Sequence, residues 1–268
     1  MKHLLIALSI TLALPVFAQK KPGKGEKFFY KDATIETSDY KIYIVDAVAV
    51  PAYSKFKLKI FNKTNDFLII KPSEMMLVAN GKNIENKEKP FVVPPNDEGS
   101  KVIDFKGADM QFQNYDLIVK GIYKAAAKGK VIELANFELP PTKNEFEAGN
   151  FSCILKKHDA NTDRSISKFE CKYNGDDVGI ISPYKTACVM PNGKENANAK
   201  REMPSLLEKG GSETFVLQYN EIAGAGDLQK KSIAIKWNEA FQESKLKTLS
   251  GSDIKIEYDS VKSTEKNK

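Results

Sequence analysis

An internal repeat with a spacing of about 112 residues constrains the fold of this chain more than any other feature of its sequence. The stretch FKLKIF at 56–61 matches FECKYN at 169–174, and LVANGK at 77–82 matches VMPNGK at 189–194. These matches follow one another in the same order and at nearly constant spacing. Solenoid repeats are much shorter, so the repeat predicts two domains of one fold in tandem.

Apolar and polar residues alternate along several stretches of the chain, and this alternation predicts that both domains are built from β-strands. Phe56, Leu58 and Ile60 lie on one face of such a strand, and Lys57 and Lys59 lie on the other. Turn residues such as Asn-Gly and Pro-Pro separate the runs. Antiparallel sheets with one solvent-exposed face have this pattern. We therefore expect an all-β chain with two antiparallel β-sandwich domains.

The repeat also divides the chain into segments. Ile132 and Leu134 are expected to close the first domain, as Ile254 and Ile256 close the second. Pro140 and Pro141 stiffen the expected linker between the domains. The predicted segments are a signal peptide (1–18), a basic flexible tail (19–27), a first sandwich (28–138), a linker (139–149), a second sandwich (150–260) and a polar tail (261–268).

The N-terminus has the three parts of a secretory signal. Lys2 and His3 form its basic start, an apolar run extends from Leu4 to Leu14, and Ala18-Gln19 is the expected cleavage site. The apolar run is shorter than a bilayer-spanning helix, and no longer apolar run follows it. We expect a periplasmic or extracellular protein without a transmembrane segment.

The charge of the chain argues against nucleic-acid binding. Its formal net charge is +6, and only two of its 41 basic residues, Arg164 and Arg201, are arginines. Phosphate and base-edge recognition favours arginine, whose planar guanidinium forms paired hydrogen bonds. Lysines scattered evenly along the chain are typical of a solvated surface. No nucleic-acid partner is therefore expected.

The stretch FKLKIFNKTNDFLIIKPSEMMLVANGK at 56–82 has a strand, a polar turn, another strand and then Asn-Gly. In this order the chain resembles the tandem immunoglobulin-like sandwiches of secreted bacterial proteins. The resemblance covers most of the mature chain, although the Cys–Trp–Cys signature of antibody domains is absent and Trp237 lies on a late strand. It implies binding, adhesion or scaffolding.

All three cysteines lie in the second half of the chain. The repeat aligns them with apolar residues of the first half, as Cys153 with Ile42, Cys171 with Leu58, and Cys188 with Met76. Two interpretations remain open. The cysteines serve as small buried apolar residues, or two of them form a disulfide, for which Cys153–Cys171 is favoured because a hairpin would make these strands neighbours. Disulfide connectivity does not follow from the sequence alone.

The stretch HDANTDRSISKFE at 158–170 has the spacing of a twelve-residue calcium loop. Arg164 occupies the position where an EF-hand needs glycine, and strands are expected on both sides instead of helices. The alternative interpretation is a polar turn, since Asp, Asn and Ser readily hydrogen-bond the local backbone. The candidate calcium ligands are Asp159, Asn161, Asp163, the carbonyl of Ser165, Ser167 and Glu170.

No catalytic motif stands out, so we expect a protein that is not an enzyme. His158 is the one histidine after the signal peptide, and no GxSxG motif is present. The favoured function is a non-enzymatic binding or scaffold protein of the bacterial envelope, with a protein or envelope polymer as partner. The alternative is a carbohydrate-binding module that uses Tyr53, Phe91 or Tyr184. An enzyme with a cleft between its domains is the third hypothesis.

Overall fold

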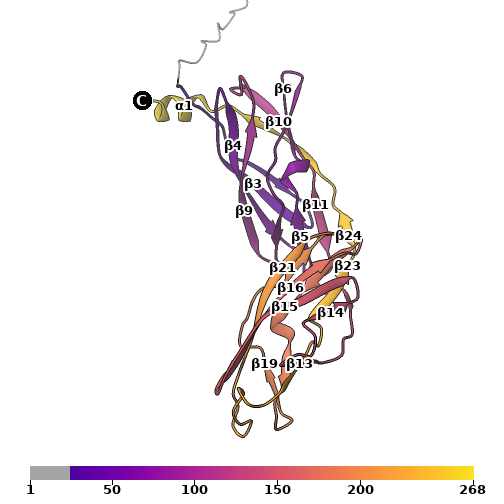
Figure 1. The fold of residues 1–268 in the computed structure, drawn as a ribbon. Coiled ribbons are helices and arrows are strands. Elements are labelled where there is room, and N and C mark those ends of the chain that lie inside the picture. The colour runs from indigo at the N-terminus through magenta and orange to yellow at the C-terminus, as the bar shows by residue number, and fades with distance from the viewer. Residues whose placement is uncertain (1–24) are drawn as a thin grey trace, which may run out of the picture.

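The computed structural model describes residues 25–268, and the predicted signal peptide 1–18 lies outside the described residues. Within residues 25–268 the chain is all-β, with its strands in six antiparallel sheets and one short α-helix. Figure 1 shows an elongated molecule in which two β-units lie end to end. None of the helices in the described range has the length and apolar character needed to cross a membrane.

The first unit contains three antiparallel sheets, and its strands come from both ends of the described chain. Its strands are β1 (Phe28–Phe29), β2 (Ala33–Glu36), β3 (Tyr40–Val50), β4 (Tyr53–Asn62), β5 (Phe67–Ile70), β6 (Met76–Ala79), β7 (Lys82–Glu85), β8 (Phe91–Val93), β9 (Glu98–Lys106), β10 (Asn114–Val119), β11 (Ile122–Ala125), β24 (Leu246–Thr248) and β25 (Ser252–Glu257). The sheet orders are β1-β3-β4-β9 with β2 beside β3, β25-β10-β6-β7, and β24-β11-β5-β8.

The second unit also contains three antiparallel sheets, and its strands are consecutive in the chain. They are β12 (Lys130–Val131), β13 (Phe137–Leu139), β14 (Glu145–Ala148), β15 (Phe151–Asn161), β16 (Arg164–Tyr173), β17 (Val178–Ile181), β18 (Ala187–Val189), β19 (Glu195–Ala197), β20 (Ser205–Leu207), β21 (Ser212–Asn220), β22 (Ile233–Lys236) and β23 (Phe241–Ser244). The sheet orders are β14-β15-β16-β21, β13-β22-β18-β19 and β12-β23-β17-β20.

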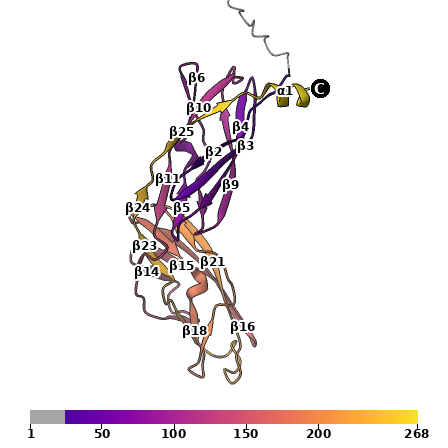
Figure 2. The same cartoon turned by 180° about the vertical axis from the view of Figure 1, so that it is seen from behind.

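The two units share one strand order. Hairpin β3–β4 with edge strand β9 corresponds to β15–β16 with β21. Strand β11 lies between β24 and β5, just as β23 lies between β12 and β17. Strand β10 lies between β25 and β6, just as β22 lies between β13 and β18. The repeat is therefore structural, but the last two strands of each sequence repeat lie in the opposite unit: β12 and β13 in the second unit, and β24 and β25 in the first. Figure 2 shows β24 and β25 along the first unit.

This exchange of strands corrects the boundaries expected from the sequence. Residues 130–138 belong to the expected first domain, yet Ile132 packs against the core of the second unit. Ile256, expected to close the second domain, is buried in the core of the first. The expected linker 139–149 contains β14, which pairs with β15. The pattern of a short strand is the same whichever unit it completes, so alternation alone does not specify its neighbours.

The C-terminal residues form the helix α1 (Ser260–Lys266) where a polar tail was expected. The carboxylate of Asp259 accepts a hydrogen bond from Lys262 N, which caps the helix N-terminus. Asn267 Nδ2 donates to Lys27 O at 2.7 Å, and Lys27 N donates to Asn267 Oδ1 at 2.9 Å. The two ends of the described chain are thereby joined at the far end of the first unit (Figure 1).

A small apolar cluster joins the two units. It consists of Ile69 and Ala125 from the first unit and Val178 and Ile180 from the second. These residues lie on strands β5, β11 and β17. All four residues of β5 and of β17 are buried, since one face of each strand covers its own core and the other faces the junction. Because the chain also crosses this junction twice, at 126–129 and at Lys245, the units are linked at several points.

The cysteines of the second unit have two different roles. Cys153 and Cys171 are directly paired across the β15–β16 hairpin and form a disulfide. Cys188 is a free, buried thiol, and burial raises its pKa to about 12. A thiol with so high a pKa holds very little thiolate at neutral pH, so Cys188 is suited to packing and not to nucleophilic chemistry.

Candidate functional site

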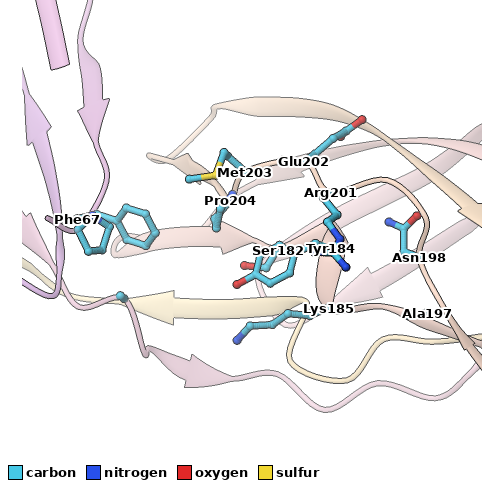
Figure 3. A pocket seen from close by; sticks show the side chains of 12 residues that line it. Phe67, Ser182, Tyr184, Lys185, Ala197, Asn198, Arg201, Glu202, Met203 and Pro204 are labelled. Atoms are coloured by element: carbon cyan, nitrogen blue, oxygen red, sulfur yellow. The ribbon is translucent and has the colours of Figure 1, made fainter. Parts of the chain in front are cut away.

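A groove lies where the second unit meets the first. We call it the junction groove, and its volume is about 600 Å³. Figure 3 shows Phe67 of the first unit facing side chains of the second, among them Tyr184, Met203 and Pro204. The lining residues are Phe67, Pro95, Ala127, Ser182, Tyr184, Lys185, Ala197, Asn198, Arg201, Glu202, Met203 and Pro204.

The loop between β19 and β20 forms one wall of the junction groove. It spans 198–204 and is two residues longer than its counterpart 86–90 in the first unit. The buried Asn198 anchors it, because its Nδ2 donates to Pro183 O at 3.0 Å and its Oδ1 accepts from Lys200 N at 3.0 Å. This buried amide holds the loop against the 3-10 helix η2 (Pro183–Lys185), which carries Tyr184.

Two large apolar side chains of the junction groove are exposed. Met203 is 64% exposed and Tyr184 is 42% exposed. The first unit has Ser73 in its 3-10 helix η1 (Pro72–Glu74) at the position that corresponds to Tyr184. The fold therefore does not require an aromatic residue there. Exposed apolar side chains that share one concave surface are typical of a binding site.

The charged side chains of the junction groove differ in how they are paired. Lys185 Nζ contacts Glu239 Oε2 at 2.7 Å, which neutralises part of its charge. Arg201 is exposed and forms no ion pair or hydrogen bond within residues 25–268. Its guanidinium is free to bind a carboxylate in two parallel hydrogen bonds. Glu202, which also lines the groove, is exposed and forms no ion pair within residues 25–268. The junction groove thus offers apolar contact beside one free cation and one free carboxylate.

The structure places the six candidate calcium ligands along a β-hairpin. The stretch 158–170 forms the end of β15, a tight turn and the start of β16. Asp159 lies opposite Ile166, and Glu170 is four residues further along β16. At about 3.3 Å per residue, some 13 Å of strand separates these positions. The hairpin therefore does not bring the two carboxylates together at one ion.

The side chains of the hairpin also point to different faces. Ser165 and Ser167 are buried, whereas Asp159 and Asn161 are exposed. Lysines already pair with the two carboxylates: Lys157 Nζ contacts Asp159 Oδ2 at 2.6 Å, and Lys156 Nζ contacts Glu170 Oε2 at 3.1 Å. Across the described part of the chain, no group of three or more His, Cys, Asp or Glu side chains is placed to hold a metal ion.

The remaining sequence candidates lie in separate places. Tyr184 lines the junction groove, and Phe91 lines a different hollow of about 390 Å³. Tyr53 lies in β4, with the ammonium of Lys55 5.0 Å from its ring centroid. His158 is half-buried in the second unit, where burial lowers the pKa of its imidazole. Of the three aromatic candidates, only Tyr184 lies in the junction groove.

No sequence motif marks Phe67, Arg201 or Met203 as a site residue. Phe67 lies in the apolar run FLII and looks like an ordinary core residue. Arg201 and Met203 lie in the β19–β20 loop, which is two residues longer than its counterpart in the first repeat. This extension is the signal that points to them, because a loop extended in one repeat alone is not required by the shared fold.

Comparisons with known proteins identify no family for this chain. No family model matches it, and no curated protein matches it. Among solved structures, red sea bream transglutaminase matches 82% of this chain at 5% identity and a TM-score of 0.20. A β-porphyranase of glycoside hydrolase family 86 from the human gut bacterium Bacteroides plebeius matches 86% at 12% identity and a TM-score of 0.18. The chain spans 31% of the length of the transglutaminase and 38% of the length of the β-porphyranase. Structural similarities with TM-scores this low show neither a family nor a function.

Proposed function

We propose that this chain is an exported, non-enzymatic binding protein that holds a segment of a partner protein in the junction groove. The observation that carries the proposal is the exposure of Met203 and Tyr184 beside the unpaired Arg201. Tyrosine and arginine are over-represented among residues that dominate protein–protein binding energies. Methionine adapts its shape to varied apolar partners. An apolar segment that carries a carboxylate fits this combination.

The proposal includes a fold assignment and a location. We assign the two units as tandem immunoglobulin-like sandwiches on the basis of their shared strand order and alternating burial. Export through the signal peptide 1–18 to the periplasm or the extracellular space is supported by the Cys153–Cys171 disulfide, because disulfides persist mainly in oxidising compartments.

A carbohydrate or envelope polymer is the second candidate ligand. The exposed ring of Tyr184 favours it, since a flat aromatic face offers a stacking surface for a sugar ring. Met203 and Pro204 favour the protein ligand, because they add apolar surface without hydrogen-bonding groups for sugar hydroxyls.

We expect the double variant Tyr184→Ala/Arg201→Gln to recover at least about tenfold less of one defined partner than the wild type, in a crosslinked pull-down from the protein's own envelope. The matched control is Tyr53→Ala/Lys87→Gln, which removes one tyrosine and one exposed positive charge from the first unit. Partner recovery should be unchanged in this control.

Equal recovery of the partner by the wild type and the groove variant would contradict the proposed site. Retention on a column of envelope polysaccharide that is lost only in the groove variant would favour the carbohydrate ligand. Both variants are checked for unchanged thermal unfolding, so that a loss of partner is not confused with a loss of fold.

A further inference from the structure

A second cavity lies in the second unit, away from the junction groove. Its volume is about 280 Å³, and it lies between the β15–β16 hairpin and the loop that precedes β22. We call it the hairpin cavity. Its polar lining includes His158, Ser165, Gln229, Lys230, Lys231 and Ser232.

The first unit provides an internal reference for the hairpin cavity. The structure shifts the sequence match of this strand by two residues, because β5 and β17 correspond at a spacing of 111 residues, so Phe56 corresponds to Ser167 and not to Phe169. Ser167 pairs with Leu217 at the sixth residue of β21, just as Phe56 pairs with Ile103 at the sixth residue of β9. Serine thus replaces a phenylalanine that is fully buried in the first unit. The fold accommodates a large aromatic side chain at this position, and the second unit has a small polar one.

A second replacement at the same end of the unit has a similar effect. The structure aligns Cys188 of β18 with Leu77 of β6, one residue away from the Met76 of the sequence match. Ile235 pairs with Cys188 as Leu117 pairs with Leu77. Two residues earlier on the same strands, Ile233 therefore corresponds to Tyr115. In the first unit Tyr115 packs edge-on against Tyr30 with ring centroids 5.1 Å apart. At both positions the second unit has a smaller side chain than the first. Ile233 lines the hairpin cavity, and Ser167 is hydrogen-bonded to His158, which also lines it.

The polar groups of the hairpin cavity are incompletely paired. Ser165 is 1% exposed, and its Oγ has no hydrogen-bond partner among the described residues. The same holds for Ser54, its counterpart in the first unit, so the hollow beside Ser165, and not the unpaired hydroxyl alone, is what distinguishes the second unit. The Nδ1 of His158 lies 3.0 Å from Ser167 Oγ. Lys230 pairs with Asp227 at 3.3 Å, whereas Lys231 forms no ion pair within residues 25–268. A buried hydroxyl without a partner destabilises the fold, and a bound acceptor would satisfy it.

We propose that the hairpin cavity binds a small oxyanion, a carboxylate or a phosphate group, through the Ser165 hydroxyl, the His158 imidazole and the Lys231 ammonium. The serine hydroxyl and the lysine ammonium donate hydrogen bonds, and lysine adds a full positive charge. The neutral imidazole donates through Nε2 in the tautomer in which Nδ1 accepts from the Ser167 hydroxyl. The carboxylate of Asp159 on the opposite face of the hairpin is paired with Lys157, so it does not offset this charge. The site is separate from the junction groove and does not rest on the function proposed for it.

The test is thermal unfolding of the second unit, followed by the fluorescence of Trp237, which is the one tryptophan of the chain. We expect inorganic phosphate or acetate at 20 mM, roughly tenfold above an assumed millimolar Kd, to raise the midpoint by about 3 °C relative to chloride at equal ionic strength. Lys231→Gln and Ser165→Ala should each abolish most of this shift. Lys87→Gln, the matched charge change in the first unit, should leave it intact.

A second readout locates the anion. In a chain that begins at Gln19, His158 is the single histidine, so its imidazole proton signals in an NMR spectrum are assigned directly. At constant pH these signals should shift saturably with the oxyanion in the wild type and in Lys87→Gln, and much less in Lys231→Gln. The response to phosphate as against acetate identifies the anion class. An equal midpoint shift in all variants, or none with either anion, would overturn the proposal.

Discussion

A chain that ends after Lys245 is expected to lose the fold of its first unit and to keep the fold of its second. The truncation removes β24 and β25, which pair with β11 and β10, and it takes the buried Ile256 out of the first core. It also removes α1 and its hydrogen bonds to the first strand. The second unit loses none of its strands, because β12 to β23 all precede the cut.

The measurement is a comparison of unfolding by Trp237 fluorescence, which reports on the second unit, with far-ultraviolet circular dichroism, which reports on both. The truncated chain should keep the fluorescence transition and lose close to half of the strand signal.

The fragment 126–245 should fold alone with a similar midpoint. The fragment 150–260, cut at the boundaries expected from the sequence, lacks β12, β13 and β14 and should not fold. Two intact transitions in the truncated chain would contradict the exchange of strands.

Trp237→Ala should lower the free energy of unfolding of the second unit by about 4 kcal/mol. Trp237 is 2% exposed and stacks on Phe146 with ring centroids 4.9 Å apart. It also meets the rings of Phe169 at 5.5 Å and Phe241 at 5.4 Å. Removing the indole leaves a large cavity among rings that are held by three different strands, so the core has little freedom to close around it.

The loss is measured by denaturant unfolding followed by circular dichroism, since the variant no longer has a fluorescent tryptophan. Tyr184→Ala is the control, because it removes an aromatic side chain that is 42% exposed in the junction groove. Its effect on stability should stay within about 0.5 kcal/mol. Similar losses in the two variants would mean that Trp237 does not organise the core.

The all-β class and the main hairpins follow from the sequence because burial alternates along their strands. Phe56, Leu58 and Ile60 are buried while Lys57 and Lys59 are not, as the pattern predicts. Near-constant spacing also identifies the repeat, and the strand order of the two units agrees with it. These features depend on local patterning, and local patterning is readable from one sequence.

The strand exchange and the two cavities depend on contacts between distant residues. Strand β12 has two residues and β24 has three, so neither carries enough pattern to specify which unit it completes. The buried amides of Asn86 and Asn198 anchor equivalent loops by accepting from Glu88 N and Lys200 N. In sequence they look like ordinary polar loop residues. The calcium interpretation shows the converse, since the spacing of Asp159 to Glu170 matches a loop although the backbone there is a hairpin.

The most direct test of the proposed function is a photo-crosslinking residue placed at Met203, compared with the same residue at Val102. Both side chains are exposed, at 64% and 52%, but Val102 lies on β9 of the first unit, outside the junction groove. In the native envelope, the groove position should give one dominant crosslinked protein, and the control position should not give it. The absence of an adduct at position 203, or the same adduct at both positions, would contradict the binding function proposed for the junction groove.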